Sequence, residues 1–167
     1  MSIPEVESRN RLLNFLKNYL VLDPVTFSAI ATSTQTISRT THTTVQFDTE
    51  TFAGIGYDTS TDTFTAPYDG KYHFHANVLW LDMAADLTGI VLYFKHNTTR
   101  YPVSTDQYFN TIATNGDITQ QGSIMLDLIK GDTVIVQVYY TGAGTTEQLY
   151  GDYVDDPRYT QFFGYRV

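Results

Sequence analysis

Four histidines are the residues of this chain best suited to catalysis or metal binding, since the sequence contains no cysteine. His73 and His75 stand two residues apart, so a β-strand would place both imidazoles on one face. Such a pair can hold a metal ion or respond to pH, and it can equally be satisfied by neighbours or water. We expect that neighbouring groups or water satisfy both imidazoles. His42 and His96 belong to no recognisable hydrolase motif.

A short acidic segment near the C-terminal end is the weak candidate for a metal site. It contains Asp152, Asp155 and Asp156. Calcium prefers several oxygen ligands, but this spacing matches no recognised calcium loop. We therefore expect a solvated acidic loop without a metal.

No combination of nucleophile, base and orienting group stands out in the sequence. The glycines of Gly54-Ile55-Gly56 and Gly142-Ala143-Gly144 mark turns or bulges, because no helix follows them to cradle a phosphate. None of the 18 acidic residues forms a distinctive pair. The sequence predicts a protein that is not an enzyme and needs no cofactor.

Charge and composition argue against several classes of binding partner. The formal net charge of -8 argues against binding to nucleic acid or to an anionic membrane surface. No apolar run approaches the roughly 18 residues that span a bilayer. The segment Met1–Glu7 lacks the basic and apolar regions of a signal peptide, so we expect no secretory leader.

Two regions differ in pattern, and we divide the chain into an arm, residues 1–23, and a β-domain, residues 24–167. In the arm Leu12, Phe15, Leu16 and Tyr19 recur at helical spacing, and Asp23-Pro24 ends the segment. A single amphipathic helix of this length is marginal alone. Its apolar stripe needs a surface, either on the chain's own domain or on a partner.

The β-domain consists of short alternating runs separated by turn residues, and it is rich in Tyr, Phe, Thr and Val. Eight to ten strands at this spacing are typical of a sandwich or jelly roll. The expected strands are 25–30, 43–47, 63–65, 71–82, 89–96, 119–128, 133–140 and 159–167.

Several ordered segments resemble the globular domain of the complement C1q and tumour-necrosis-factor-like superfamily. The most specific is Asp62-Thr63-Phe64-Thr65-Ala66-Pro67-Tyr68-Asp69-Gly70-Lys71-Tyr72-His73-Phe74. Leu126–Val134 and Phe162–Val167 are similar to that family's strand–turn–strand and closing strand. The resemblance covers nearly all of residues 25–167. It implies an all-β, ten-stranded jelly roll that packs as a homotrimer.

The long strand has two faces with different expected roles. Tyr72, Phe74, Ala76 and Val78 alternate onto one face, which we assign to the core. The resemblance implies that the other face, with His73, His75, Asn77 and Leu79, lies near the trimer interface.

The closing strand independently favours association. Phe162 and Gly164 share one face, whereas Phe163, Tyr165 and Val167 share the other. A strand that is apolar on both faces needs a cover on each, and cyclic association provides one. We therefore add Phe163 and Tyr165 to the predicted trimer interface.

These features favour a homotrimeric structural protein of a bacteriophage virion, either a capsid decoration (cement) protein or a fibre component. Such a protein needs neither leader, collagen stalk nor disulfide. Its arm would bind the major capsid protein or another virion protein. The alternative is an exported, extracellular or cell-surface recognition module that binds a glycan or a protein receptor. It would use apex loops 97–100, 142–148 and 152–158.

Overall fold

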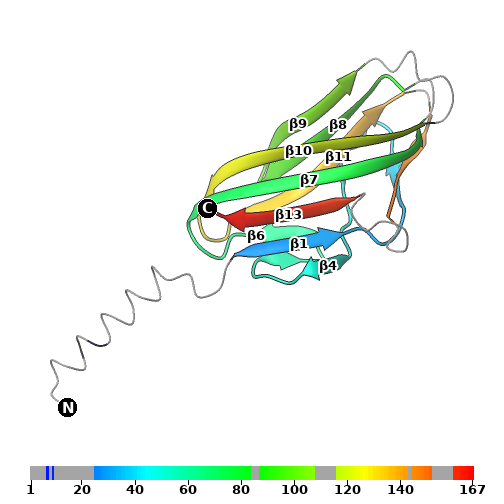
Figure 1. Cartoon of the computed structure of the whole chain (residues 1–167). Coiled ribbons are helices and arrows are strands. Elements are labelled where there is room, and N and C mark those ends of the chain that lie inside the picture. Colours follow the sequence, from blue (N-terminus) through cyan, green and yellow to red (C-terminus); the bar gives the residue numbers. More distant parts are fainter. Residues whose placement is uncertain are drawn as a thin grey trace.

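The computed structural model describes residues 7, 9, 25–83, 87–107, 116–142, 144–151 and 160–167 (Figure 1). The predicted docking residues of the arm and the three aspartates of the acidic segment lie outside these ranges. These residues are Leu12, Phe15, Leu16, Tyr19, Asp152, Asp155 and Asp156. Among the described residues, no helix has the length and apolar character needed to cross a membrane.

The described domain is built from antiparallel strands, as the alternating sequence predicts. Six of them are only two to four residues long, which is why the sequence pattern alone yields fewer strands. The strands are β1 (Thr26–Ile30), β2 (Gln35–Ser38), β3 (Thr43–Thr44), β4 (Thr49–Phe52), β5 (Tyr57–Asp58), β6 (Thr63–Thr65), β7 (Gly70–Met83), β8 (Gly89–His96), β9 (Thr99–Gln107), β10 (Gly116–Leu128), β11 (Thr133–Thr141), β12 (Thr146–Leu149) and β13 (Gln161–Arg166).

The strands form two sheets that face each other as a sandwich (Figure 1). The first sheet has the order β2-β12-β7-β13-β1-β4, with β10 on the other edge of β7. The second has the order β5-β6-β11-β8-β9, with β3 also paired to β11. The long strand β7 organises the first sheet, because β10 covers one of its edges while β13 and β12 share the other. The predicted all-β jelly roll is confirmed.

The core lies between the sheets and is strongly aromatic. Phe27 is its centre: its ring packs against Tyr57 at 4.8 Å, Phe64 at 5.2 Å and Phe162 at 4.8 Å between centroids. Aromatic pairs add to the stabilisation that comes from burial alone. The predicted core residues of β7, which are Tyr72, Phe74, Ala76 and Val78, are all fully buried.

The opposite face of β7 follows the predicted alternation for only part of its length. His73, His75 and Asn77 are partly exposed, as expected. Leu79 is 8% exposed. The Leu79 N–H donates to Thr160 Oγ1 at 3.2 Å and its carbonyl accepts from the Tyr150 N–H at 2.8 Å, so the chain itself lies against this residue.

Candidate assembly interface

The outer face of the first sheet, turned away from the core, brings together side chains from three neighbouring strands. In one row Phe163 of β13 pairs with His75 of β7, which pairs with Ser123 of β10. In the next row Tyr165 pairs with His73, which pairs with Met125. We call these six residues the outer strip.

Close packing fixes the two imidazoles of the outer strip. The His75 ring lies 5.0 Å from the Phe163 ring, and the His73 ring lies 5.1 Å from the Tyr165 ring. The His75 Nδ1 atom is 2.8 Å from Ser123 Oγ. The Nδ1 atom of His73 is buried without a hydrogen-bond partner among the described residues. Burial, followed by the neighbouring His73, lowers the pKa of His75.

The outer strip contains no Lys, Arg, Asp or Glu, and its polar side chains are the two imidazoles, the Ser123 hydroxyl and the Tyr165 hydroxyl. Tyr165 is 43% exposed and Met125 is 57% exposed, while Phe163 is partly buried. The next row towards the chain end holds Lys71 and Asp127, which form an ion pair with each other at 3.2 Å. The row on the other side holds Gln161, Asn77 and Gln121. An uncharged aromatic surface of this kind suits a protein–protein contact better than it suits water.

The outer strip thus contains four of the six residues that we predicted at the trimer interface. They are His73, His75, Phe163 and Tyr165, with Asn77 in the adjoining row. Sequence reasoning missed Ser123 and Met125, whose strand we expected without assigning its faces. Their alternation with the buried Leu126 would have placed them outward, but only the register of β10 on β7 puts them beside the histidines.

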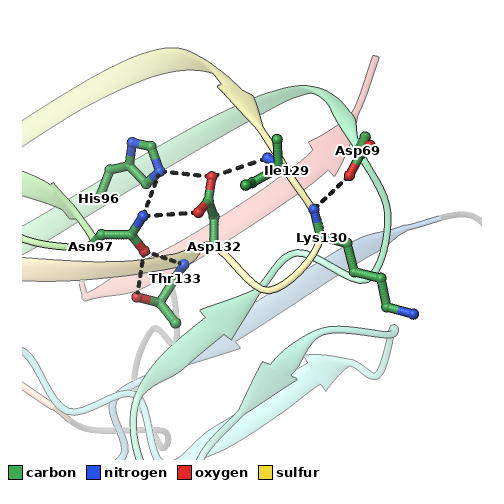
Figure 2. Close-up of polar contacts among 7 residues, drawn as sticks. All are labelled: Asp69, His96, Asn97, Ile129, Lys130, Asp132 and Thr133. Atoms are coloured by element: carbon green, nitrogen blue, oxygen red, sulfur yellow. Dashed lines mark hydrogen bonds and ion pairs between the residues drawn. The ribbon is translucent and has the colours of Figure 1, made fainter.

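A polar cluster joins the β8–β9 turn to the β10–β11 turn at one end of the sandwich (Figure 2). Asp132 accepts from the Asn97 amide at 2.9 Å and from the Ile129 N–H at 3.0 Å, and its carboxylate lies 3.1 Å from His96 Nε2. The Thr133 N–H donates to Asn97 Oδ1 at 2.9 Å. The hydrogen bonds from Asn97 and Ile129 lower the pKa of Asp132.

The same end carries the connection to the arm. The Lys130 N–H donates to Asp69 Oδ1 at 2.7 Å, and Arg166 Nη2 donates to the Asp69 carbonyl at 2.8 Å (Figure 2 shows the first contact). The Arg166 N–H in turn donates to the carbonyl of Val25 at 2.9 Å. Val25 is the residue at which the described domain begins after the arm. These contacts hold Val25, the first residue of the described domain, against the closing strand.

The loops proposed as a common apex do not lie together. Residues 97 and 98 form a tight turn beside Thr133, where β11 begins, and Thr99 and Arg100 already belong to β9. Gly142 follows the other end of β11. Loops 97–100 and 142–148 therefore lie at opposite ends of the sandwich, and the prediction that they share one surface is wrong. Loop 152–158 lies outside the described residues.

Within the ranges that the structure describes, no three His, Asp or Glu residues are grouped so as to hold a metal ion. The ionisable residues with perturbed pKa values have ordinary structural causes. Tyr57, for example, has its pKa raised first by burial in the core and then by Asp62. The arrangement is that of a packing and contact surface.

Two antiparallel sheets in this order, closed by an aromatic C-terminal strand beside β1 and β7, define a jelly roll of the C1q and tumour-necrosis-factor type. The family model for the C1q domain matches residues 26–165. The chain therefore belongs to the C1q domain family, as the sequence segments indicated.

Solved structures with low sequence identity share the fold. The globular domain of zebrafish complement 1qA is 16% identical with a TM-score of 0.58, covering 87% of this chain and 97% of that chain. Eiger TNF from S. frugiperda is 10% identical with a TM-score of 0.60, covering 87% and 93%. Murine APRIL is 14% identical with a TM-score of 0.57, covering 85% and 98%. No curated protein matches the sequence.

Proposed function

We propose that the protein is a non-enzymatic homotrimer that serves as a structural component of a bacteriophage virion. It would be a capsid decoration (cement) or fibre protein that binds the particle through residues 1–23. The observation that carries this proposal is the outer strip, an uncharged aromatic face on a chain of net charge -8.

The outer strip supports self-association on electrostatic grounds. Copies of an acidic chain repel one another over most of their surfaces. A face without charged side chains lets them approach without desolvating a charge. Membership of the C1q domain family, whose members typically form homotrimers, supports three copies around one axis.

The position of Val25, which follows the arm in the sequence, supports a role of the arm as an anchor. Val25 lies beside Arg166, at the same end as the Asn97 and Asp132 cluster. In a trimer with its sandwiches side by side, three arms would leave from one end and reach one underlying surface. Three weak contacts made by Leu12, Phe15, Leu16 and Tyr19 would then act together as one durable attachment.

Deleting residues 1–22 tests both parts of the proposal. We expect the truncated chain to remain trimeric by light scattering and to lose binding to purified particles. Loss of the trimer would make the arm an oligomerisation element. Full retention of particle binding would exclude the arm as the anchor. Detection of the intact chain in purified virions by mass spectrometry would support the virion assignment directly.

The alternative is an exported recognition module of the C1q type. The observation in its favour is that Gly142, Gly144 and Thr145, which precede β12, lie at the end of the sandwich opposite Val25. If the arm that precedes Val25 bound a surface, this loop would face away from it. Specific binding on a glycan array that is lost in a variant of the exposed loop residue Thr145, such as Thr145→Ala, would favour this alternative. Absence of the protein from purified virions would also favour this alternative.

A further inference from the structure

The outer strip places two titratable rings where the proposed contact between copies would bury them. His73 and His75 occupy successive rows of β7, and each packs against an aromatic ring of β13. A neutral imidazole fits an aromatic, uncharged contact, whereas an imidazolium loses hydration there without gaining a counter-charge.

No carboxylate of the described chain faces either imidazole. On β13 the titratable side chain in these rows is Tyr165, and on β10 the two rows hold Ser123 and Met125. On β7 and β10 the nearest charges are Lys71 and Asp127, one row away and paired with each other. The Val167 N–H donates to the Lys71 carbonyl at 2.8 Å, so Val167 of the closing segment belongs to that row as well.

We propose that protonation of His73 and His75 dissociates the assembled protein in mild acid. This inference rests on the proposed use of the outer strip as the contact between copies, and it adds a regulatory property to that contact. Three copies would bring six imidazoles into one interface, and each proton taken up would add positive charge that nothing in the strip neutralises.

The direction in which pH changes assembly follows from the coupling between proton binding and assembly. The pKa of His75 is already lowered in the single chain, first by burial and then by His73, so its uncharged form is the one that the fold prefers. Further burial in the assembly lowers it again. Assembly is therefore complete above the pKa that His75 has in the single folded chain, which lies below the ordinary histidine value of 6.5, and it weakens as the pH falls below that pKa. Each copy of His75 contributes up to about tenfold in the association constant per pH unit.

The test follows the mass of the full chain by sedimentation velocity from pH 7.5 to pH 5.0, with circular dichroism in parallel. We expect trimers at pH 7.5 and folded monomers at pH 5.0. The H73Q/H75Q double variant should remain trimeric at least one pH unit lower. H75Q alone, which can retain the contact with Ser123, should shift the midpoint by part of that amount.

His42 provides the matched control, because it packs between Tyr93 and Tyr139 on the other sheet at 5.3 and 4.8 Å. H42Q should dissociate at the same pH as the wild type. A wild-type trimer that persists at pH 5.0 overturns this inference and leaves the proposed trimer standing. A wild-type monomer at pH 7.5 overturns both. Equal midpoints for the wild type and the double variant would assign the acid response to other groups.

Discussion

Gly164 of β13 lies so close to Phe74 of β7 that a Cβ atom at this position would stand 2.5 Å from the Phe74 ring and 2.9 Å from Phe27. Because glycine has no side chain, the closing strand packs directly against the rings of Phe74 and Phe27. The same strand presents Phe163 and Tyr165 to the outer strip on its other face, so one short strand serves the core and the proposed contact together.

Gly164→Ala should destabilise the domain by about 1–3 kcal/mol, because both rings must shift to admit the methyl group. The measurement is the free energy of unfolding in urea. Gly144→Ala is the matched control, since its nearest neighbour would be Glu147 Oε1 at an ordinary 3.5 Å. Equal stabilities for the two variants would mean that the core yields more easily than this packing implies.

The buried indole of Trp80 depends on one acceptor. Its Nε1–H donates to Gln120 Oε1 at 3.1 Å in the core. Gln120→Met keeps the volume and removes the acceptor, so we expect a loss of about 1–3 kcal/mol in the free energy of unfolding. In a Trp80→Phe background the same change should cost clearly less. An identical cost in both backgrounds would show that the hydrogen bond contributes little.

The turn cluster around Asp132 should make the free energy of unfolding depend on pH in the acidic range. Asn97 and Ile129 lower the pKa of Asp132 below its unfolded value of 3.8. Its contribution is therefore present above that value and disappears as the pH falls through the lower folded value. Asp132→Asn should lower the urea midpoint at pH 7 but not at pH 2. The exposed Asp127, paired only with Lys71 in a surface contact, gives the control Asp127→Asn, which we expect to change little at either pH.

A charge placed in the outer strip should prevent assembly without unfolding the domain. Phe163→Asp would bury a carboxylate at the proposed contact in every copy, and we expect monomers with an unchanged circular dichroism spectrum. Tyr101→Asp alters an exposed aromatic residue on the other sheet and should remain trimeric. If Tyr101→Asp dissociates and Phe163→Asp does not, the contact lies on the other face.

The sequence predicted most of the fold because period-2 alternation decides which face of a strand is buried. The alternation of Tyr72 with His73 assigned the core face of β7 correctly, and that of Phe162 with Phe163 separated the buried from the outward face of the closing strand. Strand β9 was not among the expected strands, and it contains Pro102, which cannot donate a backbone hydrogen bond. The proline is tolerated there because β9 pairs with β8 alone among the described strands and so lies at the edge of the second sheet.

Contacts between distant segments explain what sequence reasoning could not supply. Met125 joins the outer strip only through the register of β10 on β7. Leu79 is buried on the outward face because Tyr150 and Thr160 return to it from far along the chain. The separation of loops 97–100 and 142–148 likewise depends on their pairing with opposite ends of β11, which no local pattern reveals.

If the outer strip joins three copies of this chain, the full chain is a trimer in solution. Light scattering at pH 7.5 measures this mass. We predict a mass three times that of the 18.9 kDa chain at micromolar concentration. A mass of one chain, unchanged as the concentration rises, would contradict the claim.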